Sequence, residues 1–284
     1  MTLEAYAKVN LTLEVGDLRP DGYHDLRSVV APISLFDVVE LDPAGDIVDA
    51  SGIDFGAENL AVRAACALRR AAGVEAGVRI AVDKRIPMGA GLGGGSADAA
   101  ATLVGLDSLW GLGWGRERLM KVAEEVGSDV PALVLAQHYR GPVLMEGRGE
   151  SVRLLDAGER GRLALSGLGD WMVLANPGVE SATAEVYARC KPREKDPSCA
   201  FDASAAPVND LQAAACALHP EIASALAALM VAGAKGAMMS GSGSTVFGFA
   251  DCRAAAERIG ASMSAIGCRV WLARSAADAC AKRR

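Results

Sequence analysis

The beginning of the chain alternates between apolar and polar positions. In residues 3–15, LEAYAKVNLTLEV, the odd positions from residue 5 onward are apolar, and the even positions between them carry polar groups. Because successive side chains of a strand point to opposite faces, this pattern predicts a strand with one polar face. That face carries Tyr6, Lys8, Asn10 and Thr12, and an isolated lysine in such a position is typically a solvated surface charge.

A turn and a second strand follow. Pro20, Asp21 and Gly22 in the segment RPDGYHDLRS are residues that favour tight turns. Residues 29–41, VVAPISLFDVVEL, then predict another strand, which we expect to be interrupted at Pro32 because proline cannot donate a ladder hydrogen bond. The start of the chain is therefore rich in β-structure.

Helical spacing begins near residue 59. Asn59 is a candidate N-cap for a helix over LAVRAACALRRAA that stops at Gly73. Residues 78–86, VRIAVDKRI, predict another strand, which leads into a glycine-rich loop. Residues 96–112 are rich in alanine and leucine, and residues 116–127 space their apolar residues for one helix face, so both predict helices.

The alternation of strands and helices restarts beyond about residue 150. Residues 171–178, WMVLANPG, predict a strand, and residues 191–199, KPREKDPSC, are polar and predict irregular structure. Residues 209–233 predict a helix, and residues 240–249, SGSGSTVFGF, form a second glycine loop that runs into apolar sequence. The pattern indicates a mixed α and β protein.

Composition narrows the class of protein. With 284 residues, 51% of them hydrophobic and 23% charged, the chain has room for two soluble domains, which we place at residues 1–150 and 151–284. The net charge of −6 disfavours nonspecific binding to nucleic acids. The apolar stretches are too short to span a bilayer, and the N-terminus lacks the features of a secretory signal, so we expect no membrane segment and a cytoplasmic location. Nothing in the composition sets the oligomeric state.

Cysteine usage adds one exclusion. Seven cysteines are scattered singly along the chain, and none forms a C-x-x-C pair. This distribution argues against both a disulfide framework and a zinc site.

The stretch PMGAGLGGGSADAA, which begins at Pro87, packs five glycines into the seven positions from Gly89 to Gly95. It satisfies the dinucleotide pattern G-x-G-x-x-G, but that fold runs a hydrophobic strand directly into its glycines, whereas Lys84, Arg85 and Pro87 intervene here. A Walker A loop requires lysine where Gly95 stands, so that interpretation fails as well.

A third interpretation keeps the phosphate chemistry of the glycines. They allow the backbone to approach phosphate oxygens, and the N-terminal amides of the following helix stabilise negative charge. A flexible connector or a tight helix contact is the alternative. Ser96 fits two compatible roles, as an ordinary helix N-cap or as a hydroxyl that donates to a phosphate or meets magnesium.

The order and spacing of PMGAGLGGGSADAA resemble the central phosphate-binding motif of the GHMP kinases, the superfamily of galactokinase, homoserine kinase and mevalonate kinase. Within that superfamily, AKVNLTLEVGDLRPDGYHDLRS, GSDVPALVL, NDLQ and MSGSGSTVFGF are similar to the corresponding segments of the kinases that act on 4-diphosphocytidyl-2-C-methyl-D-erythritol. These segments run in the expected order across nearly the whole chain. Ser128, where an alanine is usual, and the stretch AQHYRG, which includes Gln137 and His138, depart from the pattern.

The resemblance implies a fold and an activity. The fold is a two-domain α+β GHMP kinase fold, with an N-terminal ATP-binding domain like domain 2 of ribosomal protein S5 and a ferredoxin-like C-terminal domain. The activity is ATP-dependent phosphorylation of the 2-hydroxyl of that small-molecule substrate, with ATP and Mg²⁺, in the non-mevalonate route to isoprenoid precursors. Another GHMP kinase such as homoserine kinase, or a nucleotide-binding module without catalysis, is the alternative.

The resemblance also implies roles in phosphoryl transfer. It makes Asp129 the catalytic base and Lys8 the residue that holds Asp129 ionised and stabilises the transferring charge. Position alone gives Asp129 a different role, as N-cap of the helix that contains Pro131. The implied ATP-binding residues are Pro87, Met88, Gly89, Ala90, Gly91, Leu92, Gly93, Gly94, Gly95, Ser96 and Ala97.

A further set of residues is implied to bind the acceptor. Tyr23 and His24 would contact its cytidine end, and Tyr187 would stack the cytosine against Tyr23 while Thr183 bonds the base. From the residues alone, a loop histidine such as His24 is more often merely exposed, and packing within an amphipathic helix explains Tyr187 about as well as ligand binding does. Asn10 can orient a substrate hydroxyl or a phosphate, or it can simply be a solvated polar residue of a strand. Gly241, Ser242 and Gly243 can bind the acceptor or phosphates through backbone amides, or they can form a turn that connects two strands.

Overall fold

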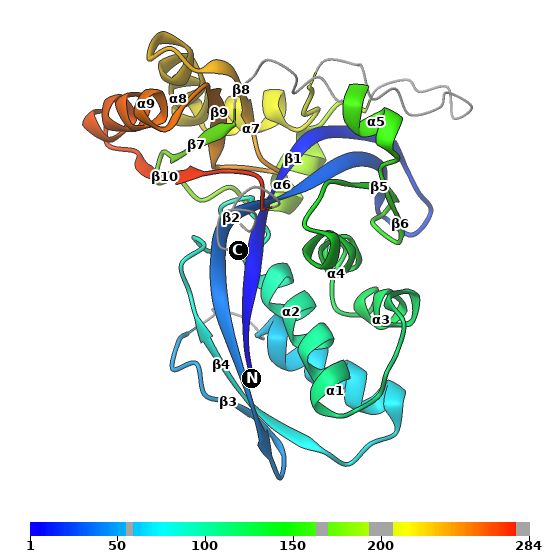
Figure 1. Cartoon of the computed structure of the whole chain (residues 1–284). Helices are drawn as coiled ribbons and strands as arrows, with labels where there is room; N and C mark the ends of the chain where they lie inside the picture. The colour runs from blue at the N-terminus through cyan, green and yellow to red at the C-terminus, as the bar shows by residue number, and fades with distance from the viewer. Residues whose placement is uncertain (55–58, 163–169, 193–206, 277–284) are drawn as a thin grey trace.

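The computed structural model describes residues 1–54, 59–162, 170–192 and 207–276. It contains a six-stranded and a four-stranded β-sheet. The long strands β1 (Thr2–Leu18) and β2 (His24–Ala44) run side by side from one lobe of the molecule into the other (Figure 1).

The six-stranded sheet is organised around β2. β1 pairs with one edge of β2 in antiparallel fashion along most of its length. The other edge pairs in turn with β5 (Val143–Gly147) and with β4 (Gly77–Asp83). β3 (Ile47–Asp49) extends the sheet beyond β4, and β6 (Ser151–Leu154) extends it beyond β5.

The second strand is not interrupted at Pro32, so that prediction is wrong. β2 is continuous over 21 residues, and Pro32 lies between the residues that pair with β5 and those that pair with β4. The missing N–H therefore removes no hydrogen bond from the ladders with β4 and β5. On the β1 side Pro32 is in register with Lys8, and the pairing shifts register between Pro32 and Phe36. The next residues instead meet the end of β10 (Arg269–Ala273), where the Ser34 N–H donates to the Arg274 carbonyl at 2.8 Å.

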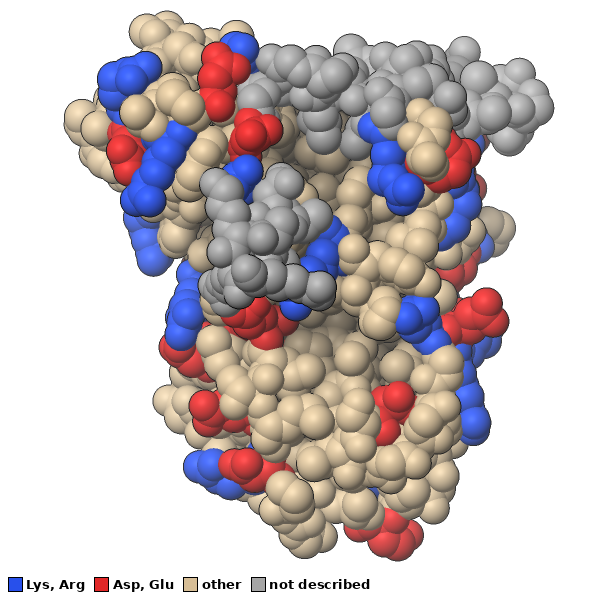
Figure 2. Space-filling model, viewed as in Figure 1, with Lys and Arg blue, Asp and Glu red and all other residues tan. Residues whose placement is uncertain are grey.

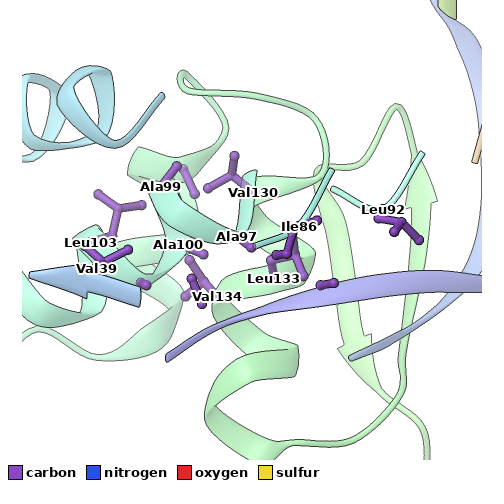
Figure 3. Close-up of a cluster of buried hydrophobic side chains, with 14 of the residues drawn as sticks. Val39, Ile86, Leu92, Ala97, Ala99, Ala100, Leu103, Val130, Leu133 and Val134 are labelled. Carbon is purple, nitrogen blue, oxygen red and sulfur yellow. The ribbon is translucent and has the colours of Figure 1, made fainter. Parts of the chain in front are cut away.

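Helices α1 to α4 pack together against this sheet (Figure 1). α1 (Leu60–Ala72) has the predicted ends: the Asn59 side chain accepts from the Ala61 N–H, and Gly73 adopts a left-handed φ of 65°. α2 (Gly94–Leu109) contacts α1, α4 (Val130–Tyr139), β1 and β2, while α3 (Arg116–Ala123) packs between α1 and α4. The small side chains of α2 allow this close packing, and Figure 3 shows them among the larger apolar residues of the core.

The second lobe follows a ferredoxin-like plan. Its antiparallel sheet has the order β10-β7-β9-β8, built from β7 (Trp171–Asn176), β8 (Lys235–Met239), β9 (Val246–Ala250) and β10. α6 (Thr183–Arg189), α7 (Gln212–Leu218) and α8 (Pro220–Val231) lie between β7 and β8, and α9 (Arg253–Ala265) lies between β9 and β10. The sequence of elements is thus β-α-β-β-α-β, as the ferredoxin-like arrangement requires, and the α+β fold class is confirmed.

The helix predicted over residues 209–233 is two helices. α7 and α8 meet at His219 and Pro220 with a bend of 117°. Proline suits the first turn of a helix but disfavours helical geometry in the preceding residue, which explains the break. Within the described residues, no single helix has the length and apolar character to cross a membrane, although this bent pair taken together passes by length and composition.

β6 pairs with β5, so the first sheet continues past residue 150, where the boundary between the two domains was predicted. α5 (Ala157–Arg162) follows β6 in the chain and precedes β7. The stretch 191–199, predicted to be irregular, falls outside the described residues from position 193 onward.

β1 connects the two hydrophobic cores. Its residues from Ala5 to Leu11 contribute to the core of the first lobe, whereas Leu13 and Val15 belong to the core of the second. The backbone of Leu13 also bonds to Val208 and Asp210 of the second lobe. The middle of β1 therefore lies where the two lobes meet.

On the face shown in Figure 2, basic and acidic side chains are interspersed over both lobes.

Candidate active site

Lys8 is buried, not solvated as an isolated strand lysine would be. The residue is 3% exposed, and its Nζ donates to Asn10 Oδ1 at 2.6 Å. The same Nζ lies 3.5 Å from Asp129 Oδ2. The glycine loop covers this part of the strand, because the Lys8 N–H donates to the Leu92 carbonyl at 3.0 Å. The polar face of β1 thus faces a site between elements and not the solvent.

Asp129 occupies the N-cap position of α4 but does not cap it. Its side chain makes no cap hydrogen bond, and its backbone is already right-handed helical, with φ −84° and ψ −14°. An N-cap residue normally has extended geometry that points its side chain at the helix amides. The carboxylate is instead directed to Lys8 and remains 34% exposed. The capping interpretation is wrong, and the carboxylate is available to a ligand.

A buried chain of hydrogen bonds holds Lys8 from the far side. Asn10 Nδ2 donates to Ser28 Oγ at 2.8 Å, and Ser28 Oγ donates to the Thr12 carbonyl at 2.6 Å. Asn10 and Ser28 are 1% and 0% exposed, so each group depends on these partners. Our sequence reasoning missed Ser28. Its only signal was its place in the segment RPDGYHDLRS, where nothing distinguished it from a strand serine.

The first glycine loop owes its shape to left-handed backbone. Gly89, Gly91 and Gly93 have φ of 64°, 76° and 68°, a region that L side chains rarely adopt. A Cβ on Gly93 would lie 3.0 Å from Lys8 Cγ and Cε, so this glycine also makes room for the lysine stem. α2 begins at Gly94 with Gly93 as N-cap and has no side-chain cap. Ser96 therefore lies within the first turn, which corrects its predicted N-cap role.

The second glycine loop lies against the first. Ser240 Oγ donates to the Gly91 carbonyl at 2.9 Å, and a Cβ on Gly91 would come within 2.2 Å of the Ser240 carbonyl oxygen. Asn209, in the NDLQ segment, holds this loop by donating to the Met239 and Gly241 carbonyls, each at 2.8 Å. The resemblance pointed to that segment without assigning Asn209 a role.

A cavity of about 220 Å³ lies between the two loops. Lys8, Asp129 and the acceptor candidates of the second lobe meet there, although they are widely separated in the chain. Apolar residues from both lobes complete the wall. The predicted residues that line it are Lys8, Asn10, Gly89, Gly91, Gly93, Asp129, Thr183, Tyr187, Gly241, Ser242 and Gly243.

The other predicted residues of the first loop lie away from this cavity. Ala90, Leu92 and Ala97 are buried, and the side chains of Leu92 and Ala97 contribute to the hydrophobic core. Of the remaining positions, Met88 and Gly95 are exposed, and Pro87, Gly94 and Ser96 are half-buried.

The aromatic residues are arranged differently from the prediction. The ring against Tyr187 is His24, with centroids 5.6 Å apart and an interplanar angle of 30°. Tyr23 is 53% exposed and lines a second cavity with Ser128 and Arg148. Successive side chains of an extended chain point in opposite directions, so Tyr23 turns away when His24 turns toward Tyr187. Thr183 Oγ1 lies 2.9 Å from Ser242 Oγ.

The pKa of the Tyr187 phenol depends strongly on burial and on a nearby charge. Burial raises the pKa of its phenol well above the ordinary value, and the nearby negative charge of Asp129 raises it further. Tyr187 is therefore neutral in the cavity and can donate a hydrogen bond.

Lys84 forms a buried charge cluster with Asp37 and Asp98. From the sequence, this lysine served only as an argument against a dinucleotide-binding fold. Its Nζ donates to Asp37 Oδ2 at 2.5 Å and to Asp98 Oδ2 at 2.7 Å. Burial opposes the charge of Lys84, but the two carboxylates outweigh it and raise the pKa of the ammonium. Burial raises the pKa of Asp98 to about 7 against the lowering effect of Lys84, and the negative charge of Asp37 adds to the rise.

The site fits a nucleotide better than a caged metal. Among the described residues, no three His, Cys, Asp or Glu side chains gather closely enough to hold a metal ion. The uncapped first turn of α2 and the left-handed glycines present backbone amides, which suits phosphate. Mg²⁺ is commonly bound by few protein ligands together with substrate phosphates, so the absence of a cage is compatible with a magnesium–nucleotide complex.

Comparisons with known proteins agree with this geometry. Residues 59–137 match the family GHMP kinases N terminal domain, and residues 200–267 match GHMP kinases C terminal. A 4-diphosphocytidyl-2-C-methyl-D-erythritol kinase of Geobacter sp. (strain M21) is 38% identical over 286 residues, which cover 96% of this chain and 97% of the relative.

Solved structures extend the agreement to the fold. A crystal structure of 4-(cytidine 5'-diphospho)-2C-methyl-D-erythritol kinase superposes with a TM-score of 0.78 at 35% identity, over 96% of this chain and 98% of that chain. A homoserine kinase from Cytophaga hutchinsonii reaches 0.69 at 18% identity, over 97% of this chain and 94% of that chain, and shares the fold alone. The resemblance found in the motifs is therefore confirmed, and the chain belongs to the GHMP kinases, within the family of 4-diphosphocytidyl-2-C-methyl-D-erythritol kinases.

Proposed function

We propose that this chain transfers the γ-phosphoryl group of ATP to the 2-hydroxyl of 4-diphosphocytidyl-2-C-methyl-D-erythritol, giving the 2-phosphate and ADP. The observation that carries the proposal is the Lys8–Asp129 pair in the cavity between the two glycine loops. The names of the relatives support this acceptor over homoserine. The reaction belongs to the non-mevalonate route to isoprenoid precursors, and a cytoplasmic location stays a prediction.

In this mechanism Asp129 accepts the proton of the 2-hydroxyl as the hydroxyl oxygen attacks the γ-phosphorus and ADP leaves. Its carboxylate suits the role because it lines the cavity and is partly exposed. Lys8 lies beside that carboxylate and stabilises the charge of the phosphoryl group in transit. Asn10, bonded to Lys8, orients the ammonium.

ATP phosphates are assigned to the first glycine loop. Gly89, Gly91 and Gly93 bring the backbone to the cavity, and the open amides of the first turn of α2 receive negative charge. Mg²⁺ supplies charge neutralisation when bound, and the Ser96 hydroxyl is its candidate ligand from the protein. On the acceptor side, Tyr187 and Thr183 line the cavity and are assigned to the cytosine, and the His24 ring packs against Tyr187.

The test is a transfer assay with purified protein, ATP and Mg²⁺, in which the diphosphocytidyl alcohol, homoserine and mevalonate are offered separately. We expect ADP and a singly phosphorylated product, identified by mass spectrometry, only with the first acceptor. Phosphorylation of homoserine instead would identify the protein as a homoserine kinase, the alternative within the GHMP kinases. ATP binding with no transfer to any acceptor would overturn catalysis and leave a nucleotide-binding module.

A further inference from the structure

The charge cluster around Lys84 connects three separate elements. Asp37 belongs to β2, Lys84 follows the end of β4, and Asp98 lies in α2. The lysine side chain is 10% exposed, and the carboxylates of Asp37 and Asp98 are 0% and 1% exposed. None of the three lines the cavity that holds Lys8 and Asp129. The cluster is thus a second group of buried charges that the proposed chemistry does not use.

Asp37 fixes the point at which the chain leaves β4 for the glycine loop. Its Oδ1 accepts from the N–H groups of Arg85 at 2.5 Å and Ile86 at 2.7 Å, while its Oδ2 accepts from Lys84. One carboxylate therefore holds three consecutive residues immediately before the loop. Charge-assisted bonds of this kind are short and directional.

Lys84 carries this anchoring across to the other end of the loop. Its bond to Asp98 reaches the first turns of α2, and its Nζ lies 3.2 Å from the point that a Cβ on Gly94 would occupy. The two ends of the loop are thus joined through one ammonium group, while Ile86, Leu92 and Ala97 pack in the adjoining core (Figure 3).

Stability alone is a weak reason for such a cluster. Buried ion pairs lose much of their attraction to desolvation, and here two carboxylates share a single cation. An apolar contact of similar volume would serve packing as well. The distinctive property of the cluster is fixed geometry at both ends of a loop whose glycines give it little stiffness of its own.

We propose that Asp37, Lys84 and Asp98 position the two ends of the glycine loop so that its amides match the phosphates of the nucleotide. Lys84 is a positioning residue that acts through the loop and touches no substrate. The inference rests on the proposed function, because it takes ATP as the ligand of this loop.

The experiment uses the full-length protein with Asp98→Asn and with the double variant Lys84→Met/Asp98→Asn. Asparagine keeps the shape of Asp98 and an acceptor oxygen. The double change removes one cation and one carboxylate together, so the net charge of the cluster is unchanged, and Asp37 keeps its bonds from the Arg85 and Ile86 N–H groups. We expect the KM for ATP to rise about tenfold or more in the double variant, since small misplacements of binding groups are costly. The KM for the diphosphocytidyl alcohol should stay within about twofold. Calorimetric titration with ATP in the absence of acceptor should show the same loss of affinity.

A matched control removes another buried acidic partner, far from the loop in sequence. Glu159 is 7% exposed and pairs with Arg153 through two bonds of 2.7 Å, so Glu159→Gln should leave both KM values unchanged. A folded double variant whose KM for ATP is unchanged overturns the inference. A fall in kcat with both KM values unchanged also overturns it, because that result places the effect in the transition state and not in ATP binding. A parallel rise of both KM values overturns it as well, because that result indicates general structural damage.

Two further outcomes are decisive. Should the double variant fail to fold, Asp98→Asn decides by the same criterion, with an expected rise of about threefold to tenfold in the KM for ATP. A wild-type protein that transfers no phosphate to any acceptor contradicts the proposed function and not this inference, which the calorimetric affinity for ATP still tests on its own.

Discussion

Two lysines flank the same glycine loop, and they are held very differently. Lys8 lies 3.5 Å from a single carboxylate, that of Asp129, which remains 34% exposed in the cavity. Lys84 bonds two carboxylates, Asp37 and Asp98, at 2.5 and 2.7 Å, and neither is more than 1% exposed. Both lysines are buried on strands or strand ends, so burial alone does not distinguish them.

The difference separates a group that can react from groups that cannot. Asp129 has a long contact to its cation and an open side, so it can exchange partners with a substrate hydroxyl. Both oxygens of Asp37 accept from Lys84 or from backbone N–H groups, whereas Asp98 accepts from Lys84 through Oδ2 and its buried Oδ1 has no partner among the described residues. Both carboxylates are shut off from solvent, so neither is open to a ligand as Asp129 is. A loosely held, partly exposed ion pair beside a phosphate loop is therefore the better indicator of chemistry.

The strongest test of this contrast removes the reactive pair. Asp129→Asn and Lys8→Met should each lower kcat by roughly 100-fold or more, the scale of general base and electrostatic catalysis. Methionine keeps the stem that packs beneath Gly93. Lys235→Met, which breaks the exposed pair with Asp251, is the control and should leave kcat unchanged. Steady-state assays in which Asp129→Asn and Lys8→Met both retain wild-type turnover would remove the pair from the mechanism.

The next test concerns the contact between the two loops. Gly91→Ala places a Cβ 2.2 Å from the Ser240 carbonyl oxygen, whereas Gly89→Ala meets nothing within 4 Å. Both glycines have positive φ, so both substitutions share a strain of about 1–2 kcal/mol. We expect Gly91→Ala alone to lower the free energy of unfolding further and to abolish ATP binding. Chemical denaturation and titration with ATP measure both effects, and equal behaviour of the two variants would contradict the close approach.

A smaller effect is expected from the support of Lys8. Ser28→Ala removes the hydroxyl that bonds Asn10 and the Thr12 carbonyl, and leaving buried groups unpaired costs about 1–3 kcal/mol. We expect kcat to fall about tenfold because the Lys8 ammonium loses its orientation. In a double-mutant cycle, Ser28→Ala should lower kcat no further once Lys8→Met is present. Additive losses would show that Ser28 acts independently of Lys8.

The last test concerns stability and not turnover, and it is a pH dependence of the free energy of unfolding that arises in the closed cluster. The pKa of Asp98 is raised from 3.8 to about 7 on folding, so between these values the folded state holds a proton that the unfolded state releases. The free energy of unfolding of the wild type, relative to Asp98→Asn, should fall as the pH rises from about 4 to 7, by at most about 1.4 kcal/mol per pH unit. Above about pH 7 the difference in the free energy of unfolding between the wild type and Asp98→Asn should no longer change with pH. Denaturation across this pH range that shows a constant difference would contradict the raised pKa.

The sequence predicted local features well where their causes were local. Asn59 and Gly73 bound α1 as expected, because an N-cap side chain and a left-handed glycine act on their own helix ends. Pro32, Ser96 and Asp129 did not behave as predicted. Pro32 is tolerated at a gap between two ladders, and Asp129 forms an ion pair with Lys8 in place of a cap; both outcomes depend on neighbours distant in sequence. The N-cap of α2 is Gly93, only three positions before Ser96, so that error is one of local placement.

The sequence by itself determined the left-handed glycines of the phosphate loop, the strand that carries Lys8 and Asn10, and the family. Only the tertiary structure decided that this polar strand face is buried, because the glycine loop and the second lobe both close over the middle of β1. It alone also brought Lys84 to Asp37, 47 positions away in the chain, and to Asp98, 14 positions away. Hydrophobic periodicity records which face of an element is apolar, but the partner of a buried charge depends on which elements pack together, and no local pattern encodes that.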